Sequence, residues 1–162
     1  MRFSDEQTAV ARELLARCEA TGKMIATAES CTGGSLSALL TELPGSSAML
    51  ERGFVTYANE AKTEMLGVPA EFIAMHGAVS AEVAAAMAKG ALDHSRADVS
   101  VSITGIAGPG GGTTEKPVGT VFMAGATRNS APFVERHQFD GDREAVRTAS
   151  VSAALQILQR LV

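Results

Sequence analysis

The sequence predicts an α/β fold: a single-domain, layered α/β/α sandwich built on a mostly parallel mixed sheet and spanning residues 1–162. Short apolar segments typical of buried strands alternate with longer segments that have helical spacing and capping residues. The last two expected strands follow each other with only a short turn between them, which indicates an antiparallel pair. Because 162 residues suit one domain, helices on both faces of one sheet are the simplest arrangement.

The composition argues against several classes of function. Hydrophobic residues make up 46% of the chain and aromatic residues only 4%, so the core must consist largely of aliphatic side chains. The net charge of −4 gives no electrostatic reason to expect a nucleic-acid or anionic-membrane partner. We find no apolar run of membrane-spanning length and no signal-peptide core. Cys18 and Cys31 form neither a metal-ligand spacing nor a disulfide framework, so we expect a cytoplasmic protein with no metal or other cofactor.

In the first half of the chain, capping residues and apolar spacing predict helices around two strands. Ser4 and Gln7 form a capping box that opens the first helix, and Gly22 ends this helix. Asn59 is expected to N-cap a later helix that closes at Gly67. The other elements expected here are a strand at 24–27, a helix at 35–40, a strand at 53–57 and a helix from 69 to 75 that Gly77 ends.

The second half of the chain is expected to complete the sheet with a hairpin and to close with a long helix. Ser80 caps an alanine-rich helix that reaches about residue 92, and Asp142 caps the final helix. The strands expected here are 99–104, 118–126 and 133–139, the last two joined by a turn at 128–130. The residues of the final helix expected to face the core are Val146, Ala149, Ala153, Ile157 and Leu161.

Three polar or glycine-rich turns follow expected strands, at 30–34, 57–62 and 104–112. In open α/β sheets, ligands collect beyond the carboxyl ends of the strands. The convergence of the three turns at that edge of the sheet predicts one common site.

The first of these turns carries the strongest chemical signal. Its paired glycines, Gly33 and Gly34, let the backbone approach a ligand, and the following helix offers N–H groups to a negative oxygen. Ser30 at the mouth of the turn is a candidate nucleophile, although a tight connection with capping hydroxyls explains the same residues equally well. Cys31 is either a rival nucleophile beside a helix N-terminus or a small buried packing residue.

Six motifs, found in order over nearly the whole chain, together resemble the CinA C-terminal domain family, which includes nicotinamide-nucleotide amidases. The resemblance implies an α/β sandwich that forms a homodimer or a higher homo-oligomer. It also implies hydrolysis of the carboxamide of nicotinamide mononucleotide to nicotinate mononucleotide and ammonia. The motifs are AESCTGG at 28–34, YANEAK at 57–62, GAVS at 77–80, TGIAGPGG at 104–111, KPVGTV at 116–121 and GDR at 141–143.

The resemblance places the serine nucleophile of the family on Ser30, and its tyrosine and lysine on Tyr57 and Lys62. Amide hydrolysis needs an activated nucleophile, an acid for the departing ammonia and donors for the oxyanion. Lys62 is the base candidate, because a desolvated lysine can lose its proton near neutral pH. The histidines, all expected away from the serine turn, are His76, His94 and His137.

Each of these side chains also has a plainer interpretation. Without the family resemblance, Lys62 would be interpreted as a solvated lysine on the surface of a helix. Tyr57 either relays the proton or orients the lysine, or it half-covers the core at a strand end. Glu29 either orients Lys62 or faces water.

Further residues are candidates for substrate binding. N–H groups near Thr32, Gly33 and Gly34 are expected to hold the oxyanion. Arg143 and Arg147 either grip phosphate or form a solvated surface or subunit contact. The second expected phosphate site is a nest of N–H groups in a glycine loop, whose alternative is a flexible connection or lid; its residues are Thr104, Gly105, Gly108, Gly110 and Gly111.

Two other functions compete with the amidase. One is a catalytically silent, competence-related module that binds a nucleotide or a partner, and the other is an amidase for a different small carboxamide. A silent relative could lose its site residues, whereas this chain retains Ser30, Tyr57 and Lys62.

Overall fold

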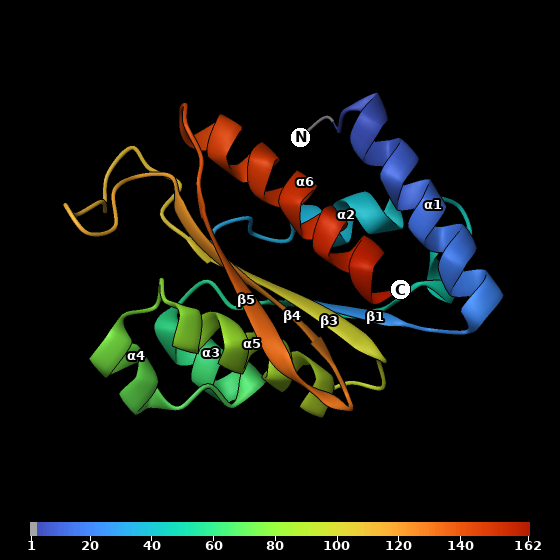
Figure 1. Ribbon diagram of the computed structural model, residues 1–162, viewed down its shortest axis with the longest axis horizontal. Coiled ribbons are helices and arrows are strands. Elements are labelled where there is room, and N and C mark those ends of the chain that lie inside the picture. The colour runs from blue at the N-terminus through green and yellow to red at the C-terminus, as the bar shows by residue number, and fades with distance from the viewer. Residues whose placement is uncertain (1–2) are drawn as a thin grey trace.

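The computed structural model describes residues 3–162, so the first two residues of the predicted 1–162 domain lie outside it. Five strands form one sheet in the order β2-β1-β3-β4-β5 (Figure 1). β1 pairs in parallel with β2 and β3, and β4 pairs antiparallel with β3 and β5, so the expected mixed sheet is confirmed. The strands are β1 (Ile25–Glu29), β2 (Leu50–Val55), β3 (Val99–Gly105), β4 (Thr120–Thr127) and β5 (Ser130–Gln138).

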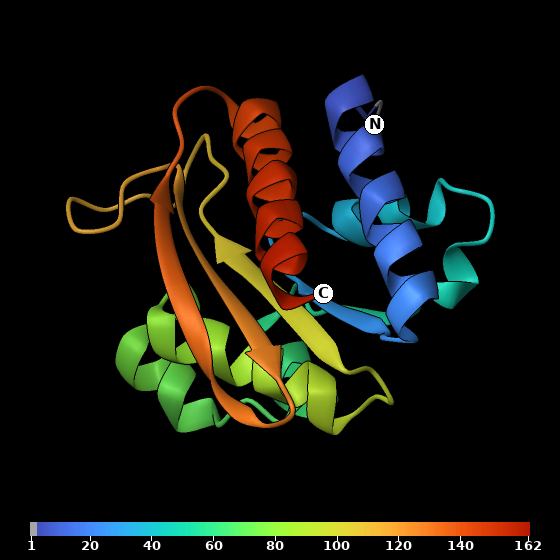
Figure 2. The ribbon, with the colours of Figure 1, turned by 45° about the vertical axis from the view of Figure 1, so that its right-hand side comes forward.

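Helices cover both faces of the sheet, which confirms the α/β/α sandwich (Figures 1 and 2). Each face has its own core of buried aliphatic residues, one formed with α1, α2 and α6 and the other mainly with α3 and α5. One layer consists of α1 (Asp5–Thr21), α2 (Ser35–Thr41) and α6 (Arg143–Leu161). The other consists of α3 (Asn59–Leu66), α4 (Ala70–His76) and α5 (Ala81–Asp93), and a short 3₁₀ turn at Ser46–Ala48 leads into β2.

Most of the predicted helix ends are confirmed. The Ser4–Gln7 capping box opens α1, and Ser80 and Asp142 cap α5 and α6 through their side chains. The predicted Asn59 cap is wrong, because Ala58 is the N-cap and Asn59 is already the first residue of α3. In α6, Ala149 and Leu161 are only partly buried, whereas the other three predicted core residues are buried.

The strand ends differ from the prediction in a way that matters for the site. β1 continues two residues beyond the predicted end and reaches Glu29. Side chains alternate between the faces of a strand, so Thr27 and Glu29 point to the α2 layer and Ala28 points to the α3–α5 layer. This alternation decides which layer each residue of the serine turn meets.

No helix within residues 3–162 has the length and apolar character needed to cross a membrane.

Candidate active site

Ser30 is held at the carboxyl end of β1 by backbone hydrogen bonds on both sides. Its N–H donates to the Ile103 carbonyl of β3 at 2.9 Å, and its carbonyl accepts from the Gly33 N–H at 3.0 Å. Gly33 and Gly34 have φ values of 60° and 96°, which glycine adopts without strain and other residues avoid. The turn therefore fixes the serine backbone at the edge of the sheet.

Lys62 reaches Ser30 from the buried side of α3. Its Nζ lies 3.1 Å from Ser30 Oγ, 2.9 Å from the Thr56 carbonyl oxygen and 3.4 Å from the Tyr57 carbonyl oxygen. The side chain is 1% exposed, and burial lowers the pKa of the amine below its ordinary value. The interpretation of Lys62 as a solvated helix lysine is therefore wrong.

The three contacts fit both protonation states of Lys62, because an ammonium can donate one N–H to each of the three oxygens, whereas a neutral amine can donate only two. A neutral amine has two N–H groups and one lone pair, and a carbonyl oxygen can only accept a hydrogen bond. If the two N–H groups are donated to the Thr56 and Tyr57 carbonyls, the lone pair is left for the Ser30 hydroxyl. This arrangement can remove the hydroxyl proton from Ser30, which is the task of a general base.

Glu29 lies on the opposite face of β1 from Lys62 and is 0% exposed. Its carboxylate accepts hydrogen bonds from the backbone N–H groups of Leu36 and Ser37, at 2.9 and 3.0 Å, and from hydroxyls of the same segment. Both interpretations offered by the sequence, a contact with Lys62 or exposure to water, are wrong.

The capping of α2 by Glu29 changes which N–H groups are available to a ligand. Those of Leu36 and Ser37 are bonded to Glu29, and that of Gly33 is bonded to Ser30. The N–H groups of Thr32 and Gly34 have no acceptor within residues 3–162. An oxyanion beside Ser30 would therefore be held by the turn rather than by the first turn of the helix.

Cys31 is packed into the core that includes α1, α2 and α6. Burial raises the pKa of its thiol to about 11, so the thiol stays protonated at neutral pH. The structure favours the packing interpretation of this residue.

The Tyr57 side chain is 59% exposed, and within residues 3–162 its hydroxyl has no hydrogen bond to Ser30 or Lys62. Its hydroxyl accepts a hydrogen bond from Arg143 Nη2 at 3.0 Å, and Arg143 Nη1 donates to the Gly108 carbonyl at 2.9 Å. Arg143 thus joins the start of α6, the β2–α3 loop and the glycine loop. It is the backbone carbonyl of Tyr57, not its phenol, that contacts Lys62.

Arg147 lies one helical turn further along α6 and packs over the serine turn. Its Nη2 donates to the Thr32 carbonyl at 3.1 Å and to Ser35 Oγ at 3.3 Å, while its Nε is buried with no partner in the described chain. Arg143 and Arg147 line an open depression of about 500 Å³ together with Asp142 and Glu144. An anion in this depression would meet two guanidinium groups and, on the same lining, the carboxylates of Asp142 and Glu144.

The glycine loop between β3 and β4 projects beyond the sheet (Figures 1 and 2). Thr104 lies below this loop: it is buried, and its hydroxyl donates to the Ala78 carbonyl at 2.8 Å. Its side chain is therefore already engaged within the fold. Gly105 ends β3 opposite Val121, whereas Gly110 and Gly111 are exposed.

The three histidines have no hydrogen bond to Ser30 or Lys62 in the described part of the chain, as the sequence led us to expect. His137 forms a hydrogen bond with Glu135, and the His94 ring forms one with the Gly90 carbonyl. His76 lies at the end of α4. Within residues 3–162, no cluster of three His, Cys, Asp or Glu side chains has the form of a metal site.

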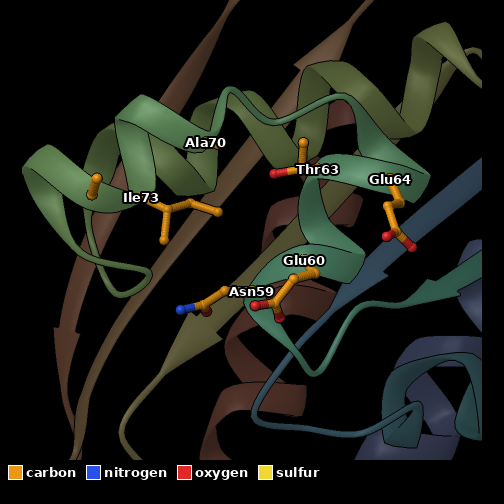
Figure 3. Close-up of a pocket in the computed structure, with 7 residues that line it drawn as sticks. Asn59, Glu60, Thr63, Glu64, Ala70 and Ile73 are labelled. Carbon is orange, nitrogen blue, oxygen red and sulfur yellow. The ribbon is translucent and has the colours of Figure 1, made fainter.

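A groove of about 380 Å³ lies between α3 and α4 (Figure 3). Neither Ser30 nor Lys62 lines this groove, so it is separate from the Ser30 site. Its lining residues are Asn59, Glu60, Thr63, Glu64, Ala70, Ile73 and Ala74.

Comparison with known proteins agrees with this architecture. Residues 7–162 match the CinA C-terminal domain. The chain is 55% identical over 140 residues to the nicotinamide-nucleotide amidohydrolase PncC of Escherichia coli strain K12, covering 86% of this chain and 85% of that protein. It is 51% identical over 158 residues to a CinA-like protein of Citrifermentans bemidjiense, covering 98% of this chain and 38% of that protein.

The solved structure of the competence/damage inducible protein CihA from Agrobacterium tumefaciens has the same fold. It superposes with a TM-score of 0.96 at 46% identity, over 99% of this chain and 98% of that chain. Since sequence and structure agree over nearly the whole length, the chain belongs to the CinA C-terminal domain family.

Proposed function

We propose that this protein is a nicotinamide-nucleotide amidase that hydrolyses nicotinamide mononucleotide to nicotinate mononucleotide and ammonia. The observation that carries the proposal is the buried Lys62 amine 3.1 Å from Ser30 Oγ. The 55% identity to a nicotinamide-nucleotide amidohydrolase supports the choice of substrate. We assign the reaction no cofactor and place it in the cytoplasm, where the free thiols of Cys18 and Cys31 are stable.

In the first half of the proposed reaction, neutral Lys62 accepts the hydroxyl proton of Ser30 as Oγ attacks the carboxamide carbon. The tetrahedral oxyanion is held by the N–H groups of Thr32 and Gly34. The Lys62 ammonium then gives its proton to the departing nitrogen. The C–N bond breaks, ammonia leaves and an acyl ester remains on Ser30.

In the second half, water replaces ammonia. Lys62 removes a proton from the water, whose oxygen attacks the ester carbon through the same oxyanion site. Collapse of the intermediate breaks the bond to Ser30 Oγ, and Lys62 returns the proton to that oxygen. The product acid loses its remaining proton to solvent, and the carboxylate leaves with the site restored.

We propose that Arg143 and Arg147 bind the substrate phosphate in their shared depression. The two guanidinium groups that line the depression support this role, because each can donate charge-assisted hydrogen bonds to phosphate oxygens. Exposed N–H groups of the glycine loop, at Gly110 and Gly111, complete the phosphate site, and Tyr57 forms its outer wall through Arg143.

Arg143→Ala is expected to raise the KM for nicotinamide mononucleotide by ~10–100-fold, the worth of one charge-assisted hydrogen bond, with little change in kcat. Steady-state kinetics with the mononucleotide and with nicotinamide riboside measure this effect. The riboside has no phosphate, so its KM should not depend on Arg143. Arg160→Ala, at the other end of α6, is the matched control. An equal effect on both substrates would contradict phosphate binding by Arg143.

The proposed function is tested by ammonia release from nicotinamide mononucleotide, nicotinamide riboside and nicotinamide, each with and without a strong chelator. We expect the mononucleotide to be preferred and the chelator to have no effect. Release from none of the three would favour a silent binding module, and a preference for another carboxamide would change the substrate. Loss on chelation that one divalent ion restores would overturn the metal-free mechanism.

We also propose that the protein is a homodimer or a higher homo-oligomer. Within the described chain, α4 contributes no buried residue, and it exposes the large apolar side chains of Phe72 and Met75. A second copy that covers this helix would remove that surface from water.

A further inference from the structure

Glu29 is a fully buried carboxylate to which the reaction proposed for Ser30 and Lys62 gives no role. It directly precedes Ser30, yet its side chain lies on the other face of β1. A buried carboxylate is expensive unless every acceptor position is satisfied. The groups that donate hydrogen bonds to Glu29 therefore indicate which part of the site it holds in place.

Both oxygens of Glu29 are satisfied from one short segment. Oε1 accepts from Thr32 Oγ1 at 2.7 Å and from the Leu36 N–H at 2.9 Å. Oε2 accepts from the Ser37 N–H at 3.0 Å and from Ser37 Oγ at 2.9 Å. Since a backbone N–H can only donate, each oxygen of the Glu29 side chain must act as an acceptor.

A further hydroxyl and a glycine extend this cluster to the neighbouring strand. Thr27 Oγ1 lies 2.6 Å from Ser37 Oγ, and Thr27 pairs with Gly53 of β2. A Cβ on Gly53 would collide with the Ser37 hydroxyl and would lie 2.9 Å from Thr27 Oγ1. The backbone of β2 therefore leaves room for the hydroxyls that hold the Glu29 carboxylate.

The contacts of Glu29 bracket the segment that carries the proposed oxyanion donors. Thr32 lies within the turn, and Leu36 and Ser37 lie in the first turn of α2. Between the bracketed positions lie Gly33 and Gly34, the two most pliable residues of the segment. The carboxylate also occupies the N–H groups at which an anion would otherwise bind.

We infer that Glu29 is a positioning residue that fixes the 30–34 turn, so that Ser30 Oγ and the free N–H groups of Thr32 and Gly34 face one reacting atom. This inference rests on the proposed function for its substrate. Glu29 acts through the backbone and touches neither Ser30 Oγ nor Lys62. A displacement of about 1 Å in such a site can cost ~10²-fold in rate.

Glu29→Gln tests this role, because glutamine has nearly the same volume but keeps only one acceptor oxygen. We expect kcat to fall ~10²-fold while the KM for nicotinamide mononucleotide changes less than about threefold, since Arg143 is held by Tyr57 and Gly108, outside the turn. The pH dependence of the remaining activity should be unchanged, because Lys62 is untouched. A Glu29→Gln variant that is folded by circular dichroism and retains wild-type kcat would overturn the inference.

Glu51→Gln is the matched control. Glu51 is also a shielded carboxylate with both oxygens hydrogen-bonded, to Arg52 at 2.7 and 2.8 Å, but it lies at the start of β2, away from the serine turn. The control should retain wild-type kcat. If Glu29→Gln does not fold, Ser37→Ala removes one donor to the carboxylate and should lower kcat in the same direction by a smaller factor. Wild-type kcat in that variant would then count against the inference.

A fluorophosphonate that labels nucleophilic serines separates this inference from the proposed substrate. If wild type labels at Ser30 but does not hydrolyse the nucleotide, the proposed function fails. Slower labelling of Glu29→Gln would still support the positioning role, and equal labelling would overturn it. If wild type neither labels nor hydrolyses, both proposals fail.

Discussion

Ser30→Ala is expected to abolish ammonia release, with kcat lowered by at least ~10⁴-fold. The hydroxyl is the atom that attacks the carboxamide, and within the described chain no other hydroxyl contacts Lys62 Nζ. The backbone of the turn is held by hydrogen bonds to Ile103 and Gly33, which alanine keeps. Ammonia release and circular dichroism together report the loss of chemistry and the retention of fold.

Cys31→Ala is the companion variant for that experiment. Its thiol is buried and has a pKa raised to about 11. Its removal should lower the free energy of unfolding through lost packing and leave kcat nearly unchanged. An active Ser30→Ala together with an inactive Cys31→Ala would reverse the assignment of the nucleophile.

Lys62→Arg is expected to lower kcat by ~10²–10⁴-fold, nearly as much as Lys62→Ala. Arginine keeps the positive charge but stays protonated, so it can hold an oxygen but cannot accept the Ser30 proton. Lys89→Arg, an exposed helix lysine paired with Asp93, is the control that should leave turnover unchanged. Substantial turnover in Lys62→Arg would make Lys62 a binding group and overturn its assignment as the base for Ser30.

The pH dependence of wild type and Lys62→Ala is a second test of Lys62 as the general base. Lys62 accepts a proton only as the neutral amine, so kcat/KM of wild type should rise with pH through the pKa of Lys62. Because burial lowers that pKa, the rise should be complete at a lower pH than for an exposed lysine. Lys62→Ala should lose this limb, and its persistence would assign the limb to another group.

The sequence predicted the fold well because its local signals are strong. Ser4, Ser80 and Asp142 cap helices through their own side chains, so their roles need no tertiary information. The prediction for Asn59 is wrong because α3 begins one residue earlier than a cap at Asn59 requires, with Ala58 at the N-cap and no side-chain cap hydrogen bond. The preference of asparagine for the N-cap position therefore does not decide where this helix begins.

The site was harder to predict than the fold. Glu29 was misplaced because the predicted strand ended at Thr27, and the two further residues of β1 determine which face each side chain meets. The Thr56 carbonyl that holds Lys62 has no sequence signature, since every residue has a carbonyl. The contact of Tyr57 with Arg143 joins residues 86 positions apart, which no local pattern reveals.

The hydrogen bond from Ser30 to Ile103 has a consequence for the order in which the site is assembled during folding. Ser30 and Lys62 are only 32 positions apart, so both reactive groups are present early in synthesis. The Ser30 N–H, however, is anchored on β3, whose pairing with β1 closes a long loop of chain. A growing chain that ends after α3 therefore contains the nucleophile and its base but not the anchor that orders them. We expect hydrolytic competence to arise late, when β3 docks and α6 brings Arg143 to Tyr57.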